Sequence, residues 1–200
     1  MGGGRPPRFL FIAGRVALDF VHTGGEGWRA RWERWHRPAD LAEWMQACPR
    51  LEVTARVGAR DLRTARALRE AIWVAAHARL EGKAVPAGAA RVIAAAAARP
   101  DLVPVLRGGR TLGWREDARG VEVLSTVARD AVTLLGGEVC GRLRECANPR
   151  CALLFVDLSR SGRRAWCTMR RCGNLSKIAR YRSGRKRDLT AKARKKGARA

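Results

Sequence analysis

Long apolar runs are missing from this 200-residue sequence. No stretch approaches the roughly 20 apolar residues that a membrane-spanning helix requires. The short apolar patch near the N-terminus is interrupted by Gly14 and Arg15, so it lacks the hydrophobic region of a secretory signal. We therefore expect a soluble cytoplasmic protein with no membrane partner. Because cytosolic thiols are kept reduced, its cysteines favour metal binding over disulfide bonds.

Acidic residues are scarce as well. The chain has 18 Asp and Glu against 41 Lys and Arg, a formal net charge of +23. From residue 140 to the end there are 19 basic and 3 acidic residues, a net charge of +16, whereas the first 139 residues carry +7. Part of the arginine excess reflects a composition rich in Ala, Arg and Gly. This composition does not explain why the basic residues cluster after residue 140. A field of this density attracts polyanions, and we expect the protein to be associated with the nucleoid.

Groups suited to catalysis are few. The three histidines, His22, His36 and His77, stand apart from one another in the sequence, and Cys48 and Cys140 are isolated thiols that we expect to be buried. No glycine-rich phosphate loop, catalytic triad or open metal site is recognisable. The sequence therefore predicts a binding protein and not an enzyme. An enzymatic activity of the N-terminal region and a role in protein interaction alone are the minor alternatives.

The distribution of apolar residues divides the chain into three parts. Residues 1–139 predict an α+β domain with several helices and a small antiparallel sheet. Its expected elements are a strand at 16–23, a helix from Pro38 to residue 48, helices at 57–81, 86–100 and 121–135, and a β-hairpin turning at Gly108 and Gly109. Residues 140–184 predict a small four-cysteine zinc finger that ends in a basic helix. Residues 185–200 have almost no apolar content, so we expect a basic, mobile tail.

Four of the cysteines form two pairs with equal gaps. Four residues separate Cys146 from Cys151 and Cys167 from Cys172, and fifteen residues lie between the pairs. Two such pairs can place four thiolates around one tetrahedral Zn²⁺. The pattern predicts one structural zinc ion, and a disulfide-stapled loop is the alternative. A closed shell of four cysteines leaves no position for water or substrate.

The segment after the last of these cysteines predicts a basic helix. Asn174 is a favourable N-cap, and a helical projection places Leu175 and Ile178 on one face, which we expect to dock on the zinc-bound core. Lys177 and Arg180 lie on the opposite face and would be presented to solvent. A basic helix that projects from a rigid metal site is a common means of contacting phosphates or a DNA groove.

Eight basic residues are candidates for nucleic-acid contacts: Lys177, Arg180, Arg182, Arg185, Lys186, Arg187, Arg163 and Arg164. In the favoured interpretation they contact phosphates of double-stranded DNA, and one or two of them reach base edges. RNA or ribosome binding is the alternative, because four-cysteine knuckles with basic tails also occur there. Single-stranded bases could then stack on an exposed aromatic residue such as Tyr181 or Trp166.

The cysteine segment resembles the CGNR zinc-finger family of bacterial transcription regulators. The resemblance rests on LFVD at 154–157, Ser159, Arg160, RRAWC at 163–167, Met169 and CGN at 172–174, followed by Lys177, Arg180 and Arg182. The arginine that gives the family motif its fourth letter is replaced here by Leu175. Its expected position on the inward face favours a role in supporting the helix over a role in reading a base.

The start of the chain resembles the ABATE domain, to which this kind of finger is usually joined. The matching segments are VALDFVHT at 16–23 and ADLAEWM at 39–45, with His22 where asparagine is more usual. The resemblance implies a regulator of a bacterial stress response whose N-terminal domain binds a small-molecule or protein ligand. Since one small finger has a limited footprint on DNA, we also expect a homodimer formed through the N-terminal domain.

Overall fold

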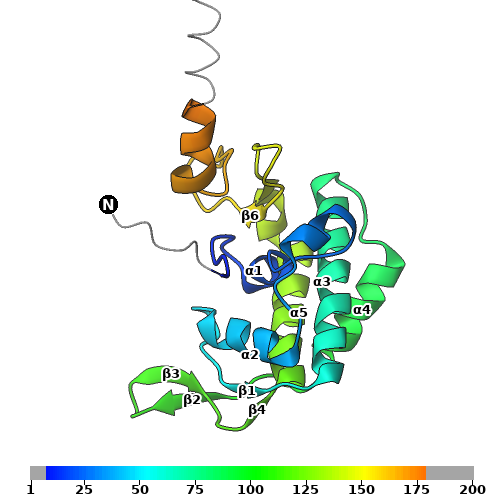
Figure 1. The fold of residues 1–200 in the computed structure, drawn as a ribbon, viewed down its shortest axis with the longest axis vertical. Helices are drawn as coiled ribbons and strands as arrows, with labels where there is room; N and C mark the ends of the chain where they lie inside the picture. Colours follow the sequence, from blue (N-terminus) through cyan, green and yellow to red (C-terminus); the bar gives the residue numbers. More distant parts are fainter. Residues whose placement is uncertain (1–7, 179–200) are drawn as a thin grey trace, which may run out of the picture.

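Helices dominate the N-terminal part of the structure. The computed structural model describes residues 8–178. The helices of this part are α1 (Val16–Val21), α2 (Pro38–Ala47), α3 (Ala59–Leu80), α4 (Ala87–Ala97) and α5 (Gly120–Gly136), with a 3-10 helix at Gly27–Trp32 and another at Glu138–Arg142. The helices α3, α4 and α5 pack against one another, and α1 packs on both α3 and α5 (Figure 1). No helix within residues 8–178 is both long and apolar enough to cross a membrane.

Strands are short, and within the described residues they lie in three separate pairs. β1 (Ala55–Arg56) is parallel to β4 (Ala118–Arg119), whereas β2 (Pro104–Arg107) and β3 (Thr111–Trp114) form an antiparallel hairpin. Further along the chain, β5 (Leu143–Glu145) is antiparallel to β6 (Leu154–Val156). The hairpin β2–β3 and the segment that follows β6 lie at opposite ends of the molecule (Figure 1). The predicted class of helices with small antiparallel sheets is confirmed.

The expected strand at 16–23 is wrong, because Val16–Val21 forms α1. The helix is completely buried, and a side chain of α5 satisfies its first turn: Asp130 Oδ2 accepts a hydrogen bond from the amide of Ala17 at 2.8 Å. Asp130 Oδ1 also pairs with Arg15 at 2.7 Å. A short apolar run fits a buried strand and a buried helix equally well. The carboxylate that favours the helix comes from 113 residues further along the chain.

The other predicted elements of the N-terminal domain are confirmed, with shifts of a few residues at their ends. These elements are the helices expected from Pro38, at 57–81, at 86–100 and at 121–135, together with the hairpin. Asp61 caps the N-terminus of α3, because its carboxylate accepts a hydrogen bond from the amide of Gly58 at 2.8 Å. In the hairpin, Gly108 and Gly109 have φ angles of 55° and 67°, the left-handed region that tight turns of this kind use.

One hydrophobic core extends from the N-terminal domain into the C-terminal segment. In the N-terminal domain, Phe20, Trp35 and Trp44 are fully buried and have ring centroids 4.8 to 5.9 Å apart, in tilted and edge-on arrangements that aromatic pairs favour. Phe155 and the four paired cysteines belong to the same cluster of buried residues. The finger therefore shares its core with the helices and does not build a separate one, as expected for a segment of its size.

Buried ion pairs lie beside this core. Arg69 is only 2% exposed and donates to both carboxylate oxygens of Glu33, at 2.9 and 2.5 Å. Burial alone would raise the pKa of Glu33, but hydrogen bonds from Arg69 and from the backbone lower it overall. Next to this pair, Arg29 is bonded to Glu70 and lies 4.0 Å from the ring centroid of Trp73. Because a buried charge without a partner is strongly destabilising, each of these groups depends on its partner.

Hydrogen bonds join the start of the N-terminal domain to β6. The amide of Val156 donates to the carbonyl oxygen of Ala13 at 2.8 Å, and Nε2 of His22 donates to the carbonyl oxygen of Leu154 at 2.9 Å. Gly14, with a φ of 84°, makes the turn between these contacts. Strand β6 is therefore fixed against the segment that contains α1.

Candidate metal centre and basic surface

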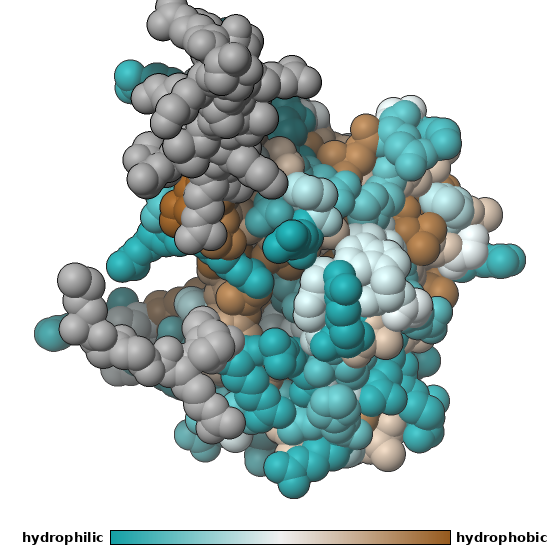
Figure 2. Space-filling view, turned by 45° about the horizontal axis from the view of Figure 1, so that its top comes forward, coloured by the Kyte–Doolittle hydropathy of each residue, from teal (hydrophilic) through white to brown (hydrophobic). Residues whose placement is uncertain are grey.

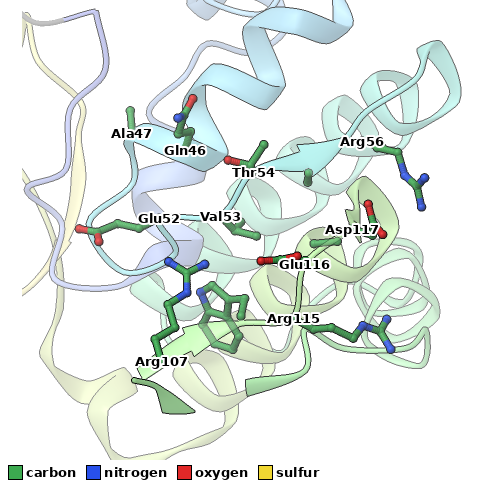
Figure 3. Close-up of a pocket in the computed structure, with 13 residues that line it drawn as sticks. Gln46, Ala47, Glu52, Val53, Thr54, Arg56, Arg107, Arg115, Glu116 and Asp117 are labelled. Carbon is green, nitrogen blue, oxygen red and sulfur yellow. The ribbon is translucent and has the colours of Figure 1, made fainter. Parts of the chain in front are cut away.

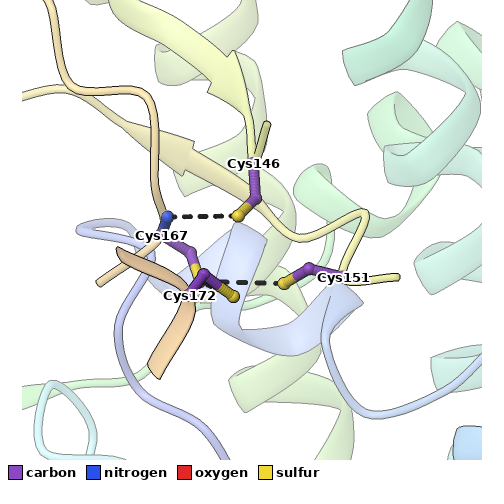
Figure 4. A group of neighbouring side chains, drawn as sticks. All are labelled: Cys146, Cys151, Cys167 and Cys172. Carbon is purple, nitrogen blue, oxygen red and sulfur yellow. Dashed lines mark hydrogen bonds between the residues drawn. The ribbon is translucent and has the colours of Figure 1, made fainter. Parts of the chain in front are cut away.

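The paired cysteines converge in the C-terminal part of the structure (Figure 4). They are Cys146, Cys151, Cys167 and Cys172. The first pair is bent by a turn in which the amide of Cys151 donates to the carbonyl oxygen of Asn148 at 2.8 Å. The second pair is bent in the same manner, since the amide of Cys172 donates to the carbonyl oxygen of Thr168 at 3.1 Å. Each pair thus forms a knuckle that approaches the centre from its own side.

The geometry of the thiols fits one zinc ion. All four Sγ atoms lie within 4.8 Å of one another, and all four residues are buried. The Sγ atom of Cys167 lies 3.7 Å from that of Cys151 and 3.6 Å from that of Cys172. Tetrahedral zinc with Zn–S bonds of about 2.3 Å requires sulfur atoms roughly 3.8 Å apart. The four cysteines form no disulfide, so the stapled-loop alternative is not supported and the site is that of one structural zinc.

Burial and mutual hydrogen bonds shift the pKa values of three of these thiols in different directions. A hydrogen bond from the Cys167 thiol lowers the pKa of Cys151 to about 5. The same hydrogen bond, together with burial, raises the pKa of Cys167, and burial raises that of Cys172. The thiolate form is therefore favoured at Cys151 and disfavoured at Cys167 and Cys172. A divalent ion removes this conflict, because it stabilises all its ligands in the thiolate form.

Polar groups around the sulfur atoms orient the ligands. The amide of Cys167 lies 3.4 Å from Sγ of Cys146 (Figure 4), and the side-chain amide of Asn148 lies 3.4 Å from Sγ of Cys172. Hydrogen bonds of this type stabilise thiolate charge and fix the ligand positions. With four cysteine ligands the coordination shell is closed, so the zinc holds the fold and has no position for a reacting water.

The segment between the two cysteine pairs is held by Asp157, which the sequence analysis did not single out. Its carboxylate accepts from the amides of Ser159 and Arg164, at 2.9 and 2.8 Å, and hydrogen bonds from these residues hold its pKa at about 2. The guanidinium of Arg164 lies 4.6 Å from the ring centroid of Phe155, and its Nε donates to the carbonyl oxygen of Trp166 at 2.8 Å. In the sequence, Asp157 appeared only as the last residue of the LFVD segment that carries the family resemblance, with no role assigned to it.

The helix of the finger begins earlier than predicted. A π-helical turn spans Met169–Gly173, and residues 174–178 continue it as α-helix. Its N-cap is Thr168, whose hydroxyl accepts from the amide of Arg171 at 3.1 Å. The prediction of Asn174 as the N-cap is therefore wrong, because the second knuckle itself supplies the first helical residues.

The predicted docking of Leu175 and Ile178 on the core is also wrong. These side chains are 57% and 48% exposed, and Met169 on the same helix is 52% exposed. Because the helix starts at Met169, its buried side is the one that carries Cys172 and Gly173. The finger consequently presents apolar as well as basic side chains, and hydrophobic patches are visible among the hydrophilic side chains in Figure 2.

Several of the predicted nucleic-acid contacts can be located. Lys177 and Arg163 are exposed on the finger, whereas Arg164 is partly buried with its guanidinium against the ring of Phe155. Five others, Arg180, Arg182, Arg185, Lys186 and Arg187, lie outside the described residues, as does the predicted tail at 185–200. The structure adds exposed arginines beside the zinc ligands, namely Arg150 next to Cys151 and Arg170 with Arg171 before Cys172.

A hollow of about 700 Å³ lies between the hairpin, β1 and the end of α2 (Figure 3). Its charged lining residues are Arg56, Arg107, Arg115, Glu52, Glu116 and Asp117. The indole of Trp114 forms one wall and donates to the carbonyl oxygen of Leu51. Because positive and negative side chains are equal in number, this hollow has no preference for a polyanion, in contrast to the finger.

The fold and the thiol cluster define a zinc-finger protein with a helical N-terminal domain. A family model named ABATE, with the description "Putative stress-induced transcription regulator", matches residues 14–138, and a second model, the CGNR zinc finger, matches residues 142–185. The chain belongs to the ABATE family and carries a CGNR zinc finger. A comparison with curated proteins finds no match.

Proposed function

We propose that the protein is a transcription regulator of a stress response that binds double-stranded DNA through its zinc finger. The observation that carries this proposal is a group of exposed cations, Arg163, Arg170, Arg171 and Lys177, on a segment that the zinc site holds rigid. The net charge of +16 from residue 140 onward supports it, because phosphate neutralisation dominates the affinity of DNA-binding proteins. The description of the matching family supports the regulatory role.

In this proposal the protein acts in the cytoplasm by binding and not by catalysis. The structural zinc fixes the two knuckles, Arg163 contacts a phosphate, and the finger helix directs Lys177 towards the nucleic acid. Contacts to phosphates position the protein without reading sequence, so base recognition requires side chains that reach a groove. A homodimer would double the number of such contacts and stays a prediction.

Fluorescence anisotropy tests this function directly. The zinc-loaded chain would be titrated into a labelled DNA duplex of mixed sequence and into a matched RNA, at two salt concentrations, with unlabelled genomic fragments as competitors. We expect salt-dependent binding to DNA for which some fragments compete far better than others. Replacing Lys177 and Arg163 together by Ala should reduce the slope of log affinity against log salt by about two.

A matched control variant separates an oriented finger from net charge. Replacing Arg91 and Arg110 by Ala removes the same charge from exposed positions outside the finger and should leave the salt slope nearly unchanged. Equal losses in the two variants would contradict an oriented finger. Equal affinity for DNA and RNA with no preferred competitor would contradict a DNA-reading regulator, and tighter binding to RNA would favour the RNA alternative.

A further inference from the structure

A second hollow lies between the N-terminal domain and the finger. Its volume is about 590 Å³, and its lining comes from residues 8–34 on one side and residues 150–171 on the other. Four of the lining residues are apolar: Leu10, Ile12, Trp32 and Leu153. Cavities that hold small molecules commonly have this size and this largely apolar character.

The charged residues of this hollow are all positive. They are Arg8, Arg34, Arg150, Arg170 and Arg171, and no Asp or Glu is among the lining residues. Arg8 is bonded to Asp40 and Glu43. Within residues 8–178 the other four guanidinium groups form no ion pair. Four arginines without an ion-pair partner around one concave site, with no carboxylate in its lining, favour an anion.

The combination of the two linings defines the class of ligand. A nucleic-acid phosphate would engage the arginines but would leave the apolar walls exposed to water, and an uncharged apolar molecule would leave the guanidinium groups without a counterion. We infer that the hollow binds a small amphipathic anion, with an aromatic or aliphatic body against Leu10, Ile12 and Trp32 and a carboxylate, sulfonate or phosphate group at the arginines.

Such a ligand would bridge both parts of the protein. Cys151, one of the four zinc-binding cysteines, is itself a lining residue, so the bound anion would lie beside the zinc site. Trp32 and Arg34 belong to the N-terminal domain. Because the complete hollow exists only while the knuckles are in place, the bound anion and the zinc ion should each increase the affinity for the other.

The probe for this site is 8-anilinonaphthalene-1-sulfonate, a fluorescent anion with an apolar aromatic body. Titration of the zinc-loaded full chain should show saturable binding of one probe molecule per chain. Changing Arg34 and Arg150 together to Glu should weaken binding by about tenfold or more, because two charge-assisted contacts become repulsive. The matched control, Arg91→Glu with Arg110→Glu, has the same change in net charge outside the hollow and should bind the probe within about twofold of the unmodified chain.

The zinc content and thermal midpoint of both double variants establish that each is folded. If the lining variant is unfolded, the single variant Arg34→Gln can be compared with the control Arg91→Gln, because each removes only one charge. An equal loss of probe affinity in the lining variant and the control variant would overturn the site. Probe binding that does not saturate would also overturn it. Loss of DNA affinity without loss of probe affinity would assign these arginines to nucleic acid instead.

Competition identifies the chemistry of the ligand. Naphthalene-2-sulfonate should displace the probe at a concentration about tenfold lower than methanesulfonate or inorganic phosphate, since only the first can fill the apolar wall. Equal displacement by all three would overturn the amphipathic ligand and leave a simple anion site. A slower loss of zinc to a chelator in the presence of naphthalene-2-sulfonate would support the coupling, and an unchanged rate would overturn it.

Discussion

The imidazole Nε2 of His22 lies 2.9 Å from the carbonyl oxygen of Leu154, and this hydrogen bond joins the end of α1 to β6 of the finger. A carbonyl oxygen can only accept, so Nε2 carries the proton. Burial lowers the pKa of His22 to about 4, and the neighbouring Arg171 also lowers it, although the hydrogen bond to Leu154 acts in the opposite direction. The ring is therefore neutral near pH 7 and binds the strand as an uncharged donor.

Replacing His22 by Leu should destabilise the junction between the two parts of the chain. The carbonyl oxygen of Leu154 would lose its donor in a buried position, which costs about 1–3 kcal/mol of unfolding free energy. Urea unfolding measures this loss, and faster transfer of zinc to a chelator should accompany it. His36→Leu, at an exposed position, is the control and should change neither quantity. If His22→Leu has the same unfolding free energy and the same rate of zinc loss as the control, the structural role of this hydrogen bond is contradicted.

Zinc content should depend on the paired cysteines alone. Cys167→Ala removes one of four ligands, so the purified variant should lose its metal, because three thiolates hold zinc far less tightly than four. Cys48→Ala and Cys140→Ala should each retain one zinc per chain; Cys48 is fully buried, and burial raises its pKa to about 11. Elemental analysis or native mass spectrometry measures the stoichiometry. Full zinc content in the Cys167 variant would refute the four-cysteine site.

Removal of the buried Arg69 should be among the most destabilising single changes in the N-terminal domain. Arg69→Met leaves the partly buried Glu33 without its bidentate partner, so we expect a loss of about 3 kcal/mol in unfolding free energy. Changing Glu33 to Gln in the same chain should recover part of this loss, because the uncompensated charge is then gone. As a control, Lys83→Met breaks a pair on the surface and should leave the denaturation midpoint nearly unchanged. Additive effects of the Arg69 and Glu33 substitutions would contradict a coupled pair.

Asp19 should make stability fall as the pH rises from about 4 to 6. Burial raises its pKa from 3.8 to about 6, even though the amide of Ala13 and the guanidinium of Arg50 favour the carboxylate. Since the folded pKa exceeds the unfolded one, its contribution is present below the unfolded value and is lost through the folded value. Relative to Asp19→Asn, the unmodified chain should lose ~2–3 kcal/mol between pH 4 and pH 7. The difference in unfolding free energy between the unmodified chain and Asp19→Asn, measured at each pH, isolates the contribution of Asp19. A difference that does not change with pH would contradict the raised pKa of Asp19.

The sequence predicted correctly those features of the structure that depend on residues close together in the chain. The spacing of the cysteines predicted the thiol cluster, and the apolar periodicity predicted α3, α4 and α5, because these features depend on residues close together in the chain. The helical state of 16–21 depends on Asp130, and the start of the finger helix depends on the bend at Thr168. The arginine-lined hollow escaped prediction for the same reason, since its two sides come from opposite ends of the chain.

The shared core also means that this finger is not an independent module. A finger with its own core can fold when it is joined to a different protein. Here, by contrast, Leu154 is hydrogen-bonded to His22 and Val156 to Ala13, across the boundary between the two parts. A recombination event near residue 140 would therefore separate halves of one folding unit. We therefore expect the finger and the N-terminal domain to unfold together in one transition, so that a substitution on either side of this junction lowers the stability of both parts.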